Sequence, residues 1–174
     1  MRKLIFLFVT ALLAVPALAV AGTPPSPADQ AAAVKQCSSE QNKMGLMPFK
    51  ALYGTNANKS NAFGKCVSKL AQLNEQDRSN AAAKCRSERS ADPTSFAATY
   101  GKGPNHRNAF GNCVSSKAKA AAAARVEATV NAAKACWTER KADVAAFRTK
   151  YGTGAHKANA FGRCVSAQVK QSGS

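Results

Sequence analysis

The stretch NAFGKCVS at residues 61–68 decides the fold, because the chain contains three copies of it that differ only in the fifth residue. Closely similar stretches begin at Asn108 and Asn159, and each of the three follows a Tyr-Gly pair by the same interval. A phenylalanine precedes each tyrosine by four residues, and another cysteine lies 28 or 29 residues before the cysteine of the motif. Such regular recurrence indicates one supersecondary unit used three times.

Each copy is expected to form three helical pieces. The first carries the leading cysteine in an alanine-rich run. The second is short, holds the phenylalanine and tyrosine on one face, and ends at a glycine suited to a left-handed stop. After a polar loop, the third has an apolar stripe at helical spacing. Asparagine is a favoured N-cap residue, and these positions are predicted to cap the third piece: Asn61, Asn108 and Asn159.

The six cysteines fit this scheme as disulfides. Six cysteines allow fifteen pairings, but a self-contained repeat has to carry its own bridge. A unit of about 45 residues with few large apolar side chains buries too little surface to be stable alone, so a bridge of roughly 3 to 4 kcal/mol matters. The predicted bridges are Cys37–Cys66, Cys85–Cys113 and Cys136–Cys164.

The fold class is therefore all-α, with three disulfide-closed helical units. The joints between the units are free of glycine and proline and rich in good helix formers, so they are expected to be helical rods. Packing of the three units into one bundle is the alternative. The expected organisation is a signal peptide at 1–21, a Pro-rich lead at 22–29, repeat 1 at 30–74, repeat 2 at 75–120 and repeat 3 at 121–174.

The amino terminus has the order of a secretory signal. Arg2 and Lys3 precede an apolar run, and small residues follow, so cleavage near Ala19 or Ala21 is expected. The run is too short for a comfortable membrane span, and the rest of the chain holds no transmembrane segment by this reading. We expect a secreted or envelope-associated protein, which agrees with an even number of cysteines.

The composition of the chain favours some classes of function over others. The chain has 25 basic and 9 acidic residues, and a net charge of +16 favours anionic partners. With only two histidines and no C-x-x-C spacing, neither a metal site nor a cofactor is expected. No His or Asp recurs to activate the repeated serines, and no carboxylate pair is evident, so an enzyme is not expected.

The polar loop before the third helix remains as a candidate for function. It is basic in every copy and leads into a helix N-terminus, which attracts anions. The leading hypothesis is a non-enzymatic protein that binds a cell-wall polymer, acidic polysaccharide or extracellular DNA. The alternative is a structural spacer of the envelope without a specific ligand. The candidate anion-binding residues are Lys59, Lys65, Lys102, His106, Arg107, Lys157 and Arg163.

The motif pair YG and NAFGxCVS resembles segments that recur in secreted proteins of high-GC bacteria, the actinobacteria. The resemblance spans all three units, roughly residues 30–170, and is specific at the Tyr-Gly and Asn-Ala-Phe-Gly-x-Cys-Val-Ser positions. It implies secretion and a bacterial origin, and it brings no activity with it.

Overall fold

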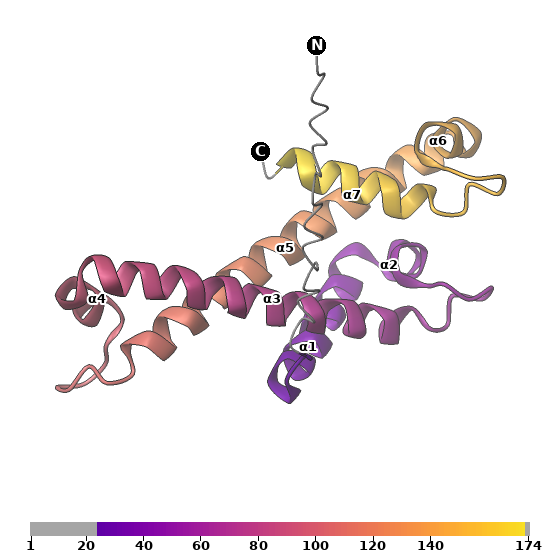
Figure 1. Cartoon of the computed structure of the whole chain (residues 1–174). Coiled ribbons are helices and arrows are strands. Elements are labelled where there is room, and N and C mark those ends of the chain that lie inside the picture. Colours follow the sequence, from indigo (N-terminus) through magenta and orange to yellow (C-terminus); the bar gives the residue numbers. More distant parts are fainter. Residues whose placement is uncertain (1–23, 173–174) are drawn as a thin grey trace, which may run out of the picture.

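The computed structural model describes residues 24–172, and that range contains seven α-helices and no strand (Figure 1). The all-α prediction is confirmed. The proposed signal peptide and the first residues of the Pro-rich lead lie outside the described residues. The helices are α1 (Pro27–Met44), α2 (Leu46–Tyr53), α3 (Ala62–Ala91), α4 (Pro93–Tyr100), α5 (Ala109–Ala142), α6 (Val144–Tyr151) and α7 (Ala160–Ser172).

Every repeat has the same internal construction. A short helix and a loop connect two longer helical segments, and a disulfide joins those segments. All three predicted bridges are confirmed: Cys37–Cys66, Cys85–Cys113 and Cys136–Cys164. The phenylalanine and tyrosine of each short helix contact one another, with ring centroids 5.0 Å apart in all three repeats. The repeat in the sequence is thus a repeat in three dimensions.

The joints between repeats are continuous helix. The helix α3 closes repeat 1 and opens repeat 2 over 30 residues, and α5 does the same for repeats 2 and 3 over 34 residues. At the rise of an α-helix, these lengths correspond to about 45 and 51 Å. Both helices end at an aspartate that also begins the next short helix. Asp92 accepts from the Ser95 backbone N–H and Asp143 from that of Ala146, each at 2.9 Å.

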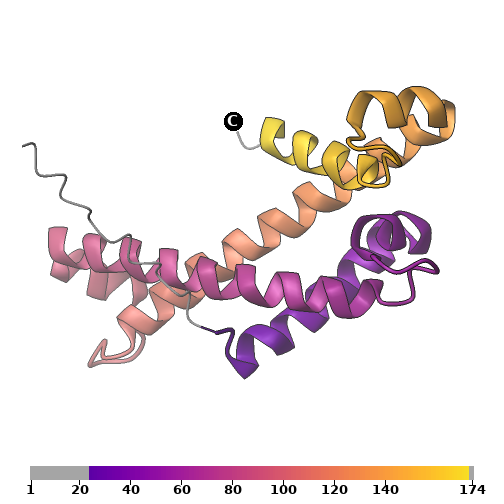
Figure 2. The ribbon, with the colours of Figure 1, turned by 45° about the vertical axis from the view of Figure 1, so that its right-hand side comes forward.

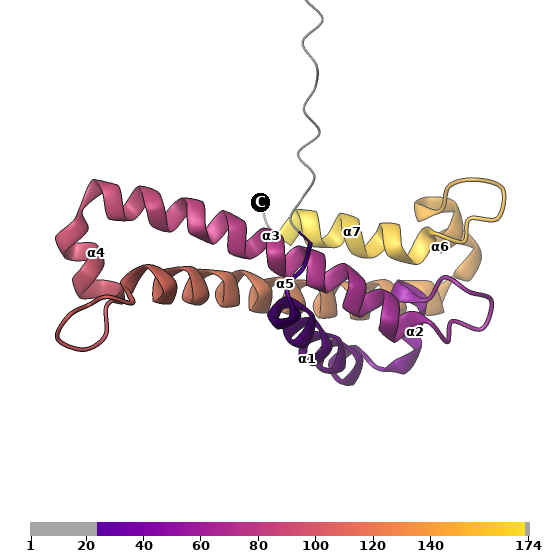
Figure 3. The same ribbon diagram turned by 60° about the horizontal axis from the view of Figure 1, so that its bottom comes forward.

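The two long helices run side by side in opposite directions (Figure 3). The chain therefore travels outward along α3, turns at α4 and returns along α5. Repeats 1 and 3 come to lie together at one end of the molecule, with α2 and α6 on the same side, while repeat 2 stands at the other end (Figures 1 and 2). The rods exist as predicted, and two of the three units also pack together, so the two alternative arrangements are combined.

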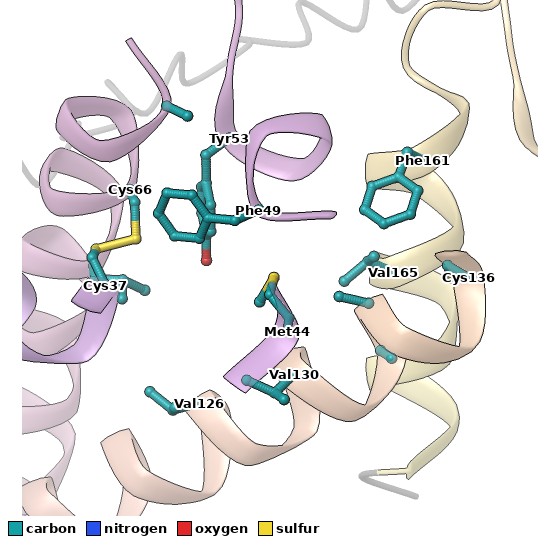
Figure 4. Close-up of a cluster of buried hydrophobic side chains, with 14 of the residues drawn as sticks. Cys37, Met44, Phe49, Tyr53, Cys66, Val126, Val130, Cys136, Phe161 and Val165 are labelled. Atoms are coloured by element: carbon teal, nitrogen blue, oxygen red, sulfur yellow. A yellow bond between two sulfur atoms is a disulfide. The ribbon is translucent and has the colours of Figure 1, made fainter. Parts of the chain in front are cut away.

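The main core is shared between repeats 1 and 3. Met44 and Phe49 from repeat 1 belong to the same buried cluster as Val130, Phe161 and Val165 of α5 and α7 (Figure 4). Repeat 2 has a separate small cluster of four buried residues, two of which are its disulfide: Cys85, Phe96, Ala109 and Cys113. Because hydrophobic stabilisation follows the apolar area removed from water, repeat 2 depends most on its bridge.

A polar network holds α1, α3 and α5 together. The buried Asn74 of α3 donates through Nδ2 to the Asp29 carbonyl oxygen of α1 at 3.2 Å. Its Oδ1 accepts from the Arg125 guanidinium of α5 at 2.8 Å, and the same guanidinium pairs with Asp77. Arg78 pairs with the Asp29 carboxylate at 2.9 Å. These bonds place α5 against α3 in one register, because a slip would leave partly buried polar groups unpaired.

The position after each tyrosine requires glycine because a side chain would not fit there, and not because the backbone adopts a left-handed conformation. The φ angles of Gly54, Gly101 and Gly152 are −71°, −74° and −80°, so the predicted left-handed conformation is wrong. A Cβ added at Gly101 would lie 2.4 Å from the His106 ring and 2.5 Å from the Ala97 carbonyl oxygen, and the other two repeats are equally crowded. The loop therefore folds back directly onto the end of the short helix.

Replacing Gly101 with alanine is expected to lower the free energy of unfolding by about 1 to 3 kcal/mol, because the new methyl group meets backbone at less than van der Waals distance. The matched control is Gly111→Ala in the first turn of α5, where a Cβ meets nothing within 4 Å. That change should instead stabilise by up to about 1 kcal/mol, since alanine has the better helix propensity. Denaturant titration of both variants measures the difference, and equal effects would contradict it.

Candidate anion-binding groove

The three polar loops share one hydrogen bond. Asn61 Oδ1 accepts from the Thr55 backbone N–H at 3.0 Å, and Asn159 Oδ1 accepts likewise from Thr153. Asn108 Oδ1 accepts from the backbone N–H of Lys102 at 3.0 Å. Each asparagine thus joins the end of its loop to the beginning.

For Asn61 and Asn108 the side chain does not cap the helix, so the predicted capping role is wrong for these two residues. Asn61 and Asn108 stand at the N-cap positions of α3 and α5, but neither side chain bonds to the first turn of its helix. Their φ and ψ angles, −82° and 5° for Asn61 and −96° and 7° for Asn108, lie outside the extended region that a capping side chain uses. Asn159 makes the same bonds to its loop.

The basic residues of these loops have partly structural roles. Lys59, His106 and Lys157 occupy equivalent positions and have positive φ angles of 59°, 46° and 47°. The Lys59 Nζ donates to the Gly54 carbonyl oxygen at 2.8 Å, which satisfies a group at the C-terminal end of α2. The Lys157 Nζ donates to Thr149 Oγ1 at 3.3 Å. Lys59 and Lys157 therefore each donate to a group of the protein itself.

The fold brings only some of the seven predicted basic residues to one place. Lys102, His106 and Arg107 lie in the loop of repeat 2, at the far end of the molecule (Figure 3). Lys59 of repeat 1 and Arg163 of repeat 3 line one groove, whereas Lys65 and Lys157 are not part of its lining. The three loops therefore do not form three equivalent sites.

This groove, which we call the cationic groove, lies where repeats 1 and 3 adjoin and has a volume of about 700 Å³. Residues of α2 and α3, of α5 and of α7 contribute to its walls. Among its described lining residues none is an aspartate or glutamate. Five are basic, one from the loop, one each from α3 and α5 and two from α7: Lys59, Lys69, Arg125, Arg163 and Lys170.

Charges of one sign along a groove strengthen its attraction for anions, because low-dielectric walls focus the field. Lys69 and Arg163 are exposed side chains that contribute their charge directly. Arg125 is partly neutralised by its ion pair with Asp77, which stands outside the lining. Hydroxyl groups from Thr55 and Ser166 add further hydrogen-bond donors. The arrangement is suited to an anion that touches several walls at once.

Sequence reasoning missed three of these five residues. Lys170 lies seven positions after Arg163, two turns further along the same face of α7, so the helical period could have linked them. Arg125 belongs to α5, which packs on α7 within repeat 3, whereas Lys69 belongs to α3 and reaches the groove only because repeats 1 and 3 pack together. No local signal in the sequence announces that proximity.

A glutamate–tyrosine hydrogen bond recurs in each repeat and was also missed. The tyrosine hydroxyl of the short helix donates to the glutamate three residues after the leading cysteine. The distances are 2.5 Å for Tyr53 with Glu40, 3.1 Å for Tyr100 with Glu88 and 3.0 Å for Tyr151 with Glu139. The three glutamates that recur singly in the sequence therefore fasten the short helix to the first helix of each repeat.

The pKa values of these equivalent glutamates are shifted in opposite directions in different repeats. Glu40 is fully buried, and burial raises the pKa of its carboxyl group above the ordinary 4.5, although Tyr53 and Arg125 act in the other direction. Burial and the neighbouring Glu40 also raise the pKa of Tyr53. In repeat 3 the hydrogen bond from Lys150 lowers the pKa of Glu139, and Lys117 does the same for the pKa of Glu88.

Stability should consequently respond to pH with opposite signs at two equivalent positions. Glu40 has a raised pKa when folded, so its contribution is greatest below pH 4.5 and is lost as pH rises through the folded value. Glu139 has a lowered pKa, so its contribution is present above pH 4.5 and is lost as pH falls through the folded value. Relative to the wild type, Glu40→Gln should become less destabilising as pH rises from about 3 to 7, and Glu139→Gln should become more destabilising over the same range. Denaturant titrations at each pH measure both effects.

A second groove, of about 860 Å³, lies between α1, α3 and α5. Alanine is the most frequent residue of its walls, and its charged side chains are four basic and one acidic: Lys35, Lys43, Arg78, Lys119 and Asp29. Asp29 pairs with Arg78 inside this groove, so it has fewer basic residues than the cationic groove and one of them is neutralised within the lining. It is a weaker candidate for an anion site than the cationic groove.

Two further findings concern residues 24–172 alone. No group of three His, Cys, Asp or Glu side chains in that range is placed to hold a metal ion. None of its helices combines the length and the apolar character that a membrane span requires. The three disulfides indicate an extracellular or otherwise oxidising environment.

Comparisons of the chain with protein-family models, with curated proteins and with solved structures each give no match. The resemblance to secreted actinobacterial proteins stays a prediction.

Proposed function

We propose that this chain is a secreted, non-enzymatic cationic repeat protein that binds anionic polymers outside the cell. Its targets would be wall polymers, acidic polysaccharide or extracellular DNA. The observation that supports this most is the cationic groove, where five basic side chains and no acidic one meet at the junction of two repeats. The signal-like first 21 residues and the three disulfides support export.

Retention on a heparin column across a salt series tests this proposal. The wild-type protein should remain bound at physiological salt, about 0.15 M, and elute at a higher concentration. A double variant, Lys69→Gln with Arg163→Gln, removes two charges from the groove and should elute at clearly lower salt. Retention of the wild type that is already lost at physiological salt would remove the support for polymer binding.

The matched control removes two charges elsewhere. Arg86 of α3 and Lys134 of α5 are exposed and do not line the groove. The variant Arg86→Gln with Lys134→Gln has the same net charge as the groove variant, and it should elute close to the wild type. If both variants shift equally, binding depends on net charge alone and the groove is not the site.

A spacer of the cell envelope is the second candidate function. The long antiparallel pair of α3 and α5 favours it, since this pair holds repeat 2 far from repeats 1 and 3 (Figure 3). A spacer has to extend over a distance, and it does not need to bind a ligand. If the protein associates with isolated cell walls equally well in the groove variant and the control variant, the spacer function is favoured over specific binding.

A further inference from the structure

The cationic groove has an aliphatic surface that a purely polar polymer would not need. Five of its lining residues are leucine or valine. Leu70 and Val165 are buried in the shared core, while the other three are partly buried beside it. The five are Leu52, Leu70, Leu73, Val165 and Val169.

Basic and aliphatic side chains lie close together on both α3 and α7. On α3, Lys69 adjoins Leu70, and Leu73 follows one turn later. On α7, Arg163 precedes Val165, and Val169 adjoins Lys170. Each wall thus offers charge and apolar surface within one turn of helix. Ligand pockets commonly combine a mostly apolar lining with a few charged groups that fix orientation, at volumes of about 300 to 1,000 Å³.

Arg125 adds a second observation. It lines the groove, and two of its guanidinium nitrogens bond to Asp77 and Asn74. Its third nitrogen, Nε, is buried and has no hydrogen-bond acceptor among the described residues. A buried donor without a partner is unfavourable, and the side chain that carries it lines the α5 wall of the groove.

We propose that the cationic groove binds a single-chain amphiphile with a phosphate head. The aliphatic chain would lie on the leucine and valine surface, and the head would lie among the basic side chains. Phosphate is preferred over carboxylate because a phosphate monoester carries close to two negative charges and several acceptor oxygens, which suits several cations. The proposal rests on the proposed function in that it takes this groove as the anion site, and it names the ligand class.

Titration calorimetry with dodecyl phosphate, below its micelle concentration, tests the proposal on the mature protein. Saturable binding with one amphiphile per chain is expected. Octyl phosphate should bind at least tenfold more weakly, since each buried methylene is worth up to about fourfold in affinity. Dodecanoate should bind more weakly than dodecyl phosphate, and dodecyltrimethylammonium should not bind. The proposal would be overturned if binding did not saturate or if octyl phosphate bound as tightly as dodecyl phosphate. It would also be overturned if dodecanoate bound more tightly than dodecyl phosphate, or if dodecyltrimethylammonium bound equally well.

Variants of the aliphatic surface separate this proposal from polymer binding. Leu73→Gln keeps every charge and should weaken dodecyl phosphate binding at least fivefold, whereas the charge variant Arg86→Gln with Lys134→Gln, which lies outside the groove, should leave dodecyl phosphate binding unchanged. Val169→Gln on the facing helix provides the same test if Leu73→Gln loses its helical circular dichroism. Heparin retention without dodecyl phosphate binding would reject the amphiphile and leave the proposed function standing. Dodecyl phosphate binding without heparin retention would reject the polymer and leave the groove as an amphiphile site.

Discussion

Replacing Cys85 and Cys113 with serine is expected to unfold the far end of the molecule while the other end stays folded. Repeat 2 has a buried cluster of only four residues, and this change removes the covalent link between two of them. The bridge closes a separation of 28 residues, for which the loss of chain entropy in the unfolded state stabilises by roughly 3.5 kcal/mol. The remaining contacts of Phe96 and Ala109 are too few to replace it.

Hydrogen exchange measured segment by segment is the appropriate observation. Amides of α4, of the end of α3 and of the start of α5 should lose most of their protection, while α1 and α2 keep theirs. The matched control is the serine pair at Cys37 and Cys66, whose separation of 29 residues is almost the same. There the shared core and the Asn74–Asp29 hydrogen bond remain, so overall stability should fall without selective opening of α2. Uniform loss of protection in both variants would show that the two ends unfold as one unit.

Local features of the fold could be predicted because their causes lie close together in the sequence. Each bridge joins residues of one repeat, and the aspartate–proline pair at residues 92–93 begins a helix through short-range bonds. The roles of the loop residues were harder. Asparagine can satisfy either a helix end or a loop, and Asn61 does the latter because its backbone is not extended. Pattern alone does not distinguish these two uses.

The packing of repeat 3 against repeat 1 could not be predicted from the motifs. It depends on the lengths of α3 and α5, which set where each repeat ends and how it is rotated about the helix axis. It also depends on small residues such as Ala122 and Ala133, whose burial lets the helices approach. Alanine-rich joints suggested isolated rods because they contain few large apolar groups. In the fold the same alanines serve as contact surface, and the cationic groove is a consequence of that contact.

Arg125→Met should lower the free energy of unfolding by about 2 to 3 kcal/mol, because removing one partner of a partly buried ion pair leaves the other uncompensated. The variant keeps most of the apolar stem of the side chain but leaves the Asp77 carboxylate and the Asn74 Oδ1 without this donor. The side chains of Arg125 and Asp77 are only 18% and 17% exposed, so water replaces the lost contact poorly. Denaturant titration with an unchanged slope would measure the loss.

A double-mutant cycle with Asp77→Asn identifies the source of that loss. If the ion pair joins α5 to α3, the double variant should be more stable than the sum of the single effects allows, by about 1 to 2 kcal/mol. Strict additivity would contradict this role. Arg125 also counteracts the burial of Glu40, so Arg125→Met should raise the pKa of the Glu40 carboxyl group further, measurable by carboxyl-carbon NMR. An unchanged pKa of Glu40 would mean that Arg125 acts on α3 alone. A raised pKa would show that the arginine that lines the groove and pairs with α3 also acts on the buried glutamate.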